Sequence, residues 1–155
     1  MFSLSSPAFE NGGKIPSKYT CDEDRFLSPP LSISGVPESA ASLALIMDDP
    51  DVRKEKHPSG VFNHWVLFNL PPDTAEIPEG KPVGTAGTNG RGEMGYRGPC
   101  PPPEYEPSEH RYIFRLYALD EVLNLPSGAT KKEVLAAMEG HIIAITEFVG
   151  RYRRV

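Results

Sequence analysis

The stretch Ser42-Leu43-Ala44-Leu45-Ile46-Met47-Asp48-Asp49 decides the fold, because it is almost continuously apolar and ends in two carboxylates followed by Pro50. A short apolar run that is bounded by turn residues predicts a buried β-strand. Residues 64–70 and 110–119 form two similar runs, and each of them begins with a histidine. These three runs predict a core built from β-strands.

Polar groups stand at the ends of these runs, and the alternation of side chains along a strand assigns each group to a face. The groups are Asp49, His64, His110 and Tyr112. Counted by twos, the apolar residues on their faces are Leu43, Leu45 and Met47 for Asp49, Val66 and Phe68 for His64, and Phe114 and Leu116 for His110 and Tyr112. Burying such groups unpaired is costly. We therefore expect the strand ends to converge on a polar pocket at the rim of the core.

The composition fits one folded domain that spans residues 1–155. Its 17 prolines and 14 glycines make up about a fifth of the chain, below the roughly 25–30% that is typical of low-complexity disorder. The net charge of −5 disfavours non-specific attraction to nucleic acid or to anionic membranes. No apolar run approaches the ~20 residues of a membrane-spanning helix, so we expect no integral membrane association.

The cysteines and the N-terminus indicate the compartment. Cys21 and Cys100 are too few for a disulfide framework, and neither belongs to a Cys-x-x-Cys pair. The first residues lack the basic start and the long apolar stretch of a signal peptide. We expect a soluble cytoplasmic protein with both thiols reduced.

Turn residues divide the remainder of the chain. Residues 1–41 hold short apolar patches between Gly and Pro residues, which fits short strands and turns. Residues 52–60 are charged and predict a loop. Residues 73–109 are rich in Gly and Pro, and segments of this length are rare unless they build a binding site or contain short strands.

The helical signal is C-terminal. Thr130 and Glu133 have the spacing of a capping box and predict a helix from residue 131. A second helical stretch is expected over 141–150, with the basic residues 151–154 favouring the negative end of a helix. The fold class is therefore mostly β: an antiparallel, Greek-key-like β-sandwich with one or two C-terminal helices.

The polar groups have a chemistry that suits an anion. Two imidazoles, His64 and His110, titrate near pH ~6.5, so each can carry a proton and donate a hydrogen bond. Tyr112 adds a hydroxyl donor, and Asp49 can orient an imidazole or share a proton with a phosphate. The alternative is that the histidines only cap strand ends with satisfied hydrogen bonds. The shared edge pattern favours the ligand site.

The segment Gly95-Tyr96-Arg97-Gly98-Pro99-Cys100-Pro101-Pro102-Pro103 predicts a rigid wall, because prolines fix φ and remove N–H donors. Gly98 and Cys100 keep their N–H groups and are expected to point them at a ligand oxygen. Pro101 and Pro102 are expected to line the pocket. The alternative is a stiff loop that only covers the end of the sandwich.

Neighbouring residues have simpler interpretations. Asp48 falls on the face opposite to Asp49, and an Asx-turn explains Asp51. His57 is expected in solvent, and Trp65, on the face opposite to His64, in the core.

Other kinds of site have weaker support. Two histidines and a carboxylate resemble a facial metal triad, but no short ligand motif supports a metal, and we expect no cofactor. Cys100 lies between prolines and not at a helix N-terminus, and no Gly-x-Ser-x-Gly elbow is present, which argues against nucleophilic catalysis. His141 lies near the helix break and needs no ligand to explain it.

Several motifs together resemble the phosphatidylethanolamine-binding protein family, which includes the Raf kinase inhibitor proteins, and look most similar to its bacterial and archaeal branch. They are Tyr19-Thr20-Cys21-Asp22, Ser28-Pro29-Pro30-Leu31, Asp48-Asp49-Pro50-Asp51, Asn63-His64-Trp65, Gly95 to Pro102, and His110-Arg111-Tyr112. The resemblance implies a β-sandwich with a pocket for phosphate, acetate or phosphoethanolamine-like groups. It assigns pocket positions to Asp49, His64, His110, Tyr112 and Cys100-Pro101-Pro102.

The chain departs from the family pattern at the rim of this pocket. Arg53 replaces a proline, and the loop 104–109 is acidic where animal relatives are rich in Gly and Lys. An acidic rim repels large polyanions over ~10 Å of screened field, which disfavours Raf-type or polyphosphate partners. A small phosphomonoester remains compatible with such a rim.

Three hypotheses follow in order of preference. The first is a non-enzymatic domain that binds a small phosphorylated or carboxylate ligand. The second is an inhibitor of a serine protease or a kinase that recognises its partner through loops 52–60 and 103–109. The third is a hydrolase or metalloenzyme that uses the same cluster. The resemblance also implies that a homodimer is possible, since several prokaryotic relatives look dimeric.

Overall fold

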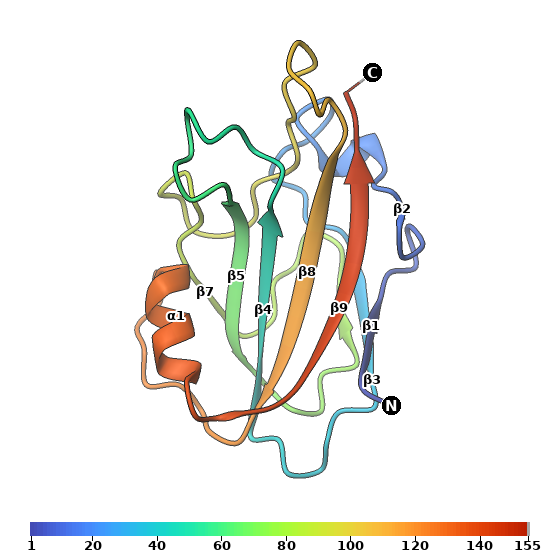
Figure 1. Ribbon diagram of the computed structural model, residues 1–155. Coiled ribbons are helices and arrows are strands. Elements are labelled where there is room, and N and C mark those ends of the chain that lie inside the picture. Colours follow the sequence, from blue (N-terminus) through green and yellow to red (C-terminus); the bar gives the residue numbers. More distant parts are fainter. Residues whose placement is uncertain (155) are drawn as a thin grey trace.

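Long antiparallel strands form the centre of the computed structural model, which describes residues 1–154 (Figure 1). The large sheet has the strand order β2-β9-β8-β4-β5-β7, and only the β2–β9 pair is parallel. Its strands are β2 (Gly13–Lys14), β4 (Ser42–Asp49), β5 (Phe62–Leu70), β7 (Thr85–Ala86), β8 (His110–Leu119) and β9 (Ile142–Tyr152). The three apolar runs of the sequence are therefore β4, β5 and β8, as predicted.

A smaller antiparallel sheet faces the large one. Its order is β1-β3-β6, made by β1 (Ser3–Ser5), β3 (Leu31–Ser34) and β6 (Glu76–Ile77). A 3₁₀ turn, η1 (Ser17–Tyr19), follows β2. The main core includes side chains from both sheets, among them Leu4, Leu31, Ile77, Leu45, Trp65 and Phe114. The predicted β-rich sandwich is confirmed.

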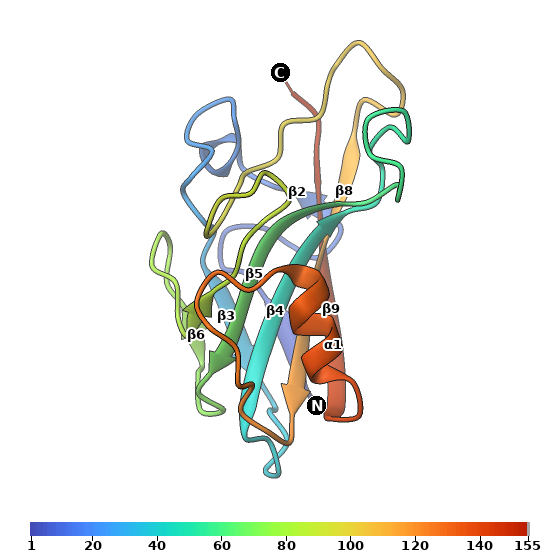
Figure 2. The ribbon, with the colours of Figure 1, turned by 90° about the vertical axis from the view of Figure 1, so that its left-hand side faces the viewer.

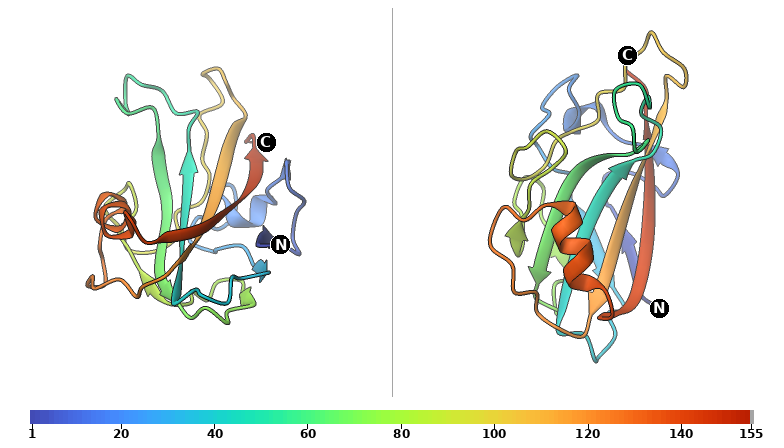
Figure 3. Two further views of the ribbon diagram at one scale, coloured as in Figure 1. Left: turned by 60° about the horizontal axis from the view of Figure 1, so that its bottom comes forward. Right: turned by 60° about the vertical axis from the view of Figure 1, so that its left-hand side comes forward.

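A second core lies on the other face of the large sheet, under helix α1 (Lys131–Met138). Val66 and Phe68 of β5 pack there with Val134 and Met138 of the helix. Figure 2 shows α1 and the small sheet on different sides of the large sheet, and Figure 3 shows α1 beside β5 and away from the C-terminal end of β9. The capping box of Thr130 and Glu133 is present as predicted. Within residues 1–154 no helix is both long and apolar enough to cross a bilayer.

The prediction of a second helix over 141–150 is wrong, because these residues form β9. Gly140 adopts a φ of 82° and reverses the chain after α1. The following segment is rich in β-branched residues, and Ala144, Phe148 and Tyr152 face the main core at strand spacing. The basic residues at its end therefore do not follow a helix: Arg151 belongs to β9 and pairs with Glu109.

A β-bulge in β5 decides which way His64 points. Met47 pairs with Trp65 and Asp48 pairs with Asn63, so His64 is the extra residue between them. Simple alternation would place His64 on the face of Val66 and Phe68, as predicted from the sequence, and in the structure that face lies under α1. The bulge instead turns its side chain to the core side, with Trp65 and toward Asp49. Trp65 is buried in the core as expected, but it does not lie on the face opposite to His64.

Candidate functional site

A cavity of about 320 Å³ lies at the end of the large sheet where β4 ends and β5 and β8 begin. The loops after β4 and before β8 form its walls. Seven of the eight residues singled out from the sequence line it: Asp49, His64, Gly98, Cys100, Pro101, Pro102 and His110. The eighth, Tyr112, is not among the lining residues. It is fully buried, with its ring centroid 5.3 Å from that of His64 and 6.4 Å from that of His110.

Asp49 and His110 form a buried pair. The Nδ1–H of His110 donates to Oδ2 of Asp49 at 2.7 Å, and both side chains are less than 5% exposed. Burial alone lowers the pKa of His110. The hydrogen bond and charge of Asp49, with smaller contributions from Asp51 and the Pro107 carbonyl, outweigh burial and raise this pKa above its ordinary value. His110 therefore holds its proton to higher pH than a free histidine.

His64 has the opposite electrostatic character. Its Nδ1–H donates to the carbonyl of Arg97 at 2.6 Å, which leaves Nε2 as its second polar atom. Burial lowers the pKa of His64, and the Arg97 carbonyl and the nearby carboxylates only partly offset this effect. A neutral imidazole with a proton on Nδ1 carries a lone pair on Nε2. The sequence led us to expect two imidazoles that both donate to the ligand. In the structure His110 is the donor, and neutral His64 offers an acceptor.

The hydroxyl of Tyr112 is buried and makes no hydrogen bond of normal geometry with residues 1–154. Burial, followed by the charge and polar contact of Asp49, raises the pKa of Tyr112 well above its ordinary value, so the phenol stays neutral. A buried polar atom without a partner is uncommon in folded proteins. The hydroxyl has no opening to the cavity, because Tyr112 is fully buried and is not among the lining residues.

The rim of the cavity is more basic than the sequence suggested. The cationic lining residues are Arg53, Lys56, Arg91 and Arg97. The acidic loop before β8 contributes only Glu106 to the lining, and Arg53 stacks over the ring of Tyr105 at 3.7 Å. The other acidic residues of this loop, Glu104 and Glu109, therefore lie outside the cavity lining.

Asp51 also differs from its prediction. Its carboxylate accepts hydrogen bonds from Nε and Nη2 of Arg111 at 3.0 and 2.8 Å. The Asx-turn is instead made by Asp49, whose side chain accepts the Asp51 N–H at 2.8 Å. The guanidinium of Arg111 lowers the pKa of Asp51. Asp51 is thus a lining residue whose negative charge is paired with the guanidinium of Arg111.

Sequence reasoning missed several lining residues, because nothing in a charged loop reveals which side chains turn inward. His57, expected in solvent, is half-buried, and its ring lies 5.3 Å from that of Phe62, another lining residue. Asp48 lies on the far side of the sheet as predicted, where it binds Lys131 at 2.7 Å.

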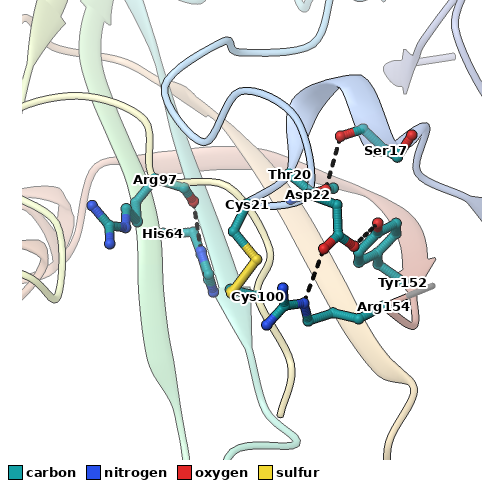
Figure 4. Close-up of a disulfide and its surroundings, with 9 residues drawn as sticks. All are labelled: Ser17, Thr20, Cys21, Asp22, His64, Arg97, Cys100, Tyr152 and Arg154. Carbon is teal, nitrogen blue, oxygen red and sulfur yellow. Dashed lines mark hydrogen bonds and ion pairs between the residues drawn. A yellow bond between two sulfur atoms is a disulfide. The ribbon is translucent and has the colours of Figure 1, made fainter. Parts of the chain in front are cut away.

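The wall formed by residues 95–103 is covalently anchored. Cys21 and Cys100 form a disulfide with a Cα–Cα distance of 5.4 Å (Figure 4), so the expectation of two reduced thiols is wrong. Their separation of 79 positions along the chain hides this approach in the sequence. The Gly98 N–H does not face a ligand, because it donates to the Arg25 carbonyl at 2.7 Å. A Cβ at Gly98 would lie 2.4 Å from the Tyr19 carbonyl oxygen, which explains the glycine.

A preassembled metal triad is not found at this site. Among residues 1–154, only Asp120, Glu121 and His141 bring three potential metal-ligand atoms within 4.8 Å of one another. The ligand atoms of Asp49, His64 and His110 lie farther apart than this. The exposed group around His141 has a simpler explanation, since each ring nitrogen lies 2.9 Å from a carboxylate oxygen.

Comparisons with known proteins agree with this fold. Residues 5–153 match the family model described as "Phosphatidylethanolamine-binding protein". A UPF0098 protein of Methanothermobacter thermautotrophicus is 50% identical over 98% of this chain and 99% of its own length. The crystal structure of a putative phosphatidylethanolamine-binding protein homolog of Chlamydia trachomatis is 44% identical, has a TM-score of 0.92, and is matched over 99% of this chain and 98% of its own. Escherichia coli YbcL, described as a member of the mammalian PEBP family, is 25% identical with a TM-score of 0.86 and 99% coverage of both chains.

Proposed function

Because the chain belongs to the phosphatidylethanolamine-binding protein family, we propose that the cavity binds a small oxyanion, either a phosphomonoester or a carboxylate, and that the protein acts through binding rather than catalysis. The observation that carries the proposal is the buried Asp49–His110 pair in the lining of a cavity that also presents Arg53, Lys56, Arg91 and Arg97. A protonated imidazole held in this way offers a fixed Nε2–H donor to an anion, and charged hydrogen bonds of this kind are stronger than neutral ones.

The other polar groups suit a phosphate that keeps one proton. His110 donates to one phosphate oxygen, and the lone pair on Nε2 of His64 accepts the proton of a P–OH group. The Cys100 N–H makes no hydrogen bond within residues 1–154 and is the remaining backbone donor of the wall. The rim cations attract the negative charge of the ligand through the local field. Carboxylates fit the same donors with fewer contacts.

Calorimetry with inorganic phosphate and with O-phosphoethanolamine from pH 5.5 to 9 tests this function. Affinity is expected to fall as pH rises through the raised pKa of His110, because the donor proton is lost there. Absence of heat at every pH, or an affinity that does not change with pH, contradicts the proposal.

A pair of histidine variants makes this test specific. His110→Gln removes the charged donor and is expected to weaken phosphate binding about 10- to 100-fold, the range of a charge-assisted hydrogen bond of ~1.5–3 kcal/mol. His141→Gln is the matched control, because His141 pairs with Asp120 and Glu121 and does not line the cavity. Equal losses in both variants argue against a role for His110 in binding.

A further inference from the structure

We propose that the Cys21–Cys100 disulfide is a reversible control of the cavity, so that the oxidised protein binds an anion more tightly than the reduced protein. The inference rests on the proposed anion binding and adds to it a thiol modification site in the wall of the cavity.

The disulfide lies where a reductant can reach it and where a ligand is affected by it. Cys100 is exposed and lines the cavity, and Cys21 is half-buried. In Figure 4 the bond lies beside the segment in which the Arg97 carbonyl holds His64. A change in the position of Cys100 therefore acts on the cavity directly.

The chain that follows Cys100 has little other support. The contacts of this loop lie beyond its prolines: Arg53 stacks over the ring of Tyr105, and the Ser108 N–H donates to the Glu106 carboxylate at 3.1 Å. The disulfide is therefore the first anchor of the loop. Residues 101–103 are three prolines, whose fixed φ angles make them a stiff arm. Freedom gained at Cys100 is transmitted along this arm to Pro101 and Pro102, which line the cavity.

The segments on the near side of Cys100 stay together without the disulfide. The Cys21 N–H donates to the Pro99 carbonyl at 3.1 Å, and the Gly98 N–H donates to the Arg25 carbonyl at 2.7 Å. The hydroxyl of Tyr96 donates to the Tyr19 carbonyl at 2.9 Å. These bonds confine the effect of reduction to the loop beyond Pro99.

The chemistry is thiol–disulfide exchange with a dithiol. One thiolate of the dithiol attacks Sγ of Cys100, the S–S bond breaks, and Cys21 leaves as a thiolate that takes up a proton. The second thiolate then attacks the mixed disulfide and releases Cys100 as a thiol. Two electrons and two protons pass to the protein, and the dithiol becomes a cyclic disulfide.

Calorimetry of phosphate binding at one pH tests the inference on three samples: oxidised protein, protein reduced with dithiothreitol, and the double variant C21S/C100S. Binding by the reduced protein and by the variant is expected to be about tenfold weaker than by the oxidised protein. This is the change that corresponds to ordering the backbone of roughly one residue. The variant is the matched control, because dithiothreitol should leave its affinity unchanged.

Amide NMR spectra of the oxidised and reduced protein locate the change, which is expected over residues 100–109. Equal affinities in the two states overturn the redox proposal and leave anion binding intact. Global unfolding on reduction also overturns it, since the inferred effect is local. No binding in either state overturns the proposed function and the redox control together.

Discussion

Replacement of Tyr112 by phenylalanine should stabilise the protein, because it removes a buried hydroxyl that lacks a hydrogen-bond partner of normal geometry among residues 1–154. The Tyr112 side chain is fully buried, and its hydroxyl has no hydrogen-bond partner of normal geometry among residues 1–154. Burying a hydroxyl without a partner costs about 1–3 kcal/mol. Tyr112→Phe removes this cost and leaves the ring in place, so we expect the free energy of unfolding to rise by about 1 kcal/mol. For a chain of this size that corresponds to an increase of roughly 2–4 °C in Tm.

Urea denaturation of the wild type and of the Tyr112→Phe variant measures this effect. Tyr96→Phe is the matched control, because the Tyr96 hydroxyl is also buried but donates to the Tyr19 carbonyl at 2.9 Å. Its removal should lower the free energy of unfolding by about 1 kcal/mol, the net value of a typical hydrogen bond. If Tyr112→Phe instead destabilises the protein as much as Tyr96→Phe does, the hydroxyl is satisfied in the unliganded protein and the reasoning is refuted.

Three further predictions concern the Asp49–His110 pair, the β-bulge at His64 and the Cys21–Cys100 disulfide. The pKa of His110 is raised on folding, so its stabilising contribution is complete below about pH 6.5 and is lost as pH rises through the raised value; urea denaturation from pH 5 to 9 should show this slope in the wild type and a smaller one in Asp49→Asn. Asn63→Leu removes the amide that donates to two backbone carbonyls across the bulge, so we expect the free energy of unfolding, measured in urea, to fall by about 2–3 kcal/mol. The imidazole NMR signal of His64 should also change, whereas an unchanged signal would show that the bulge holds without the amide. The C21S/C100S variant should lose about 4–5 kcal/mol of unfolding free energy by loop entropy over 79 residues, and a loss below 1 kcal/mol in the same assay would contradict that model.

The strands could be predicted from the sequence, but the direction of one key side chain could not. Alternation places Asp49 and Tyr112 correctly, because β4 and β8 pair without interruption over Ser42–Asp48. For His64 the same rule gives the wrong face, since one extra residue in β5 reverses the alternation. Asp49, His64 and His110 all line the cavity although the face assigned to His64 is wrong, whereas Tyr112 is not among the lining residues. No feature of the sequence reveals a bulge before the partner strand is known.

The C-terminal strand and the disulfide were missed for related reasons. Ile142, Ile145 and Phe148 fit a helical spacing, but β9 forms because β8 offers an edge and a core face to Ala144 and Phe148, which only the tertiary structure supplies. The approach of Cys21 to Cys100 likewise depends on how two distant loops pack. The basic rim arises in the same way, from loops whose inward side chains composition does not identify.

The amide of Asn63 gives this protein a built-in spectroscopic probe. Its Nδ2 bonds the carbonyls of Met47 and Trp65 on either side of His64 and reaches Asp48 on the helix side of the sheet. Asn63 does not line the cavity, so an added anion does not touch it. Its side-chain NH2 resonances should therefore report ligand occupancy through the backbone alone, free of the direct shifts that a bound molecule causes in the histidine signals.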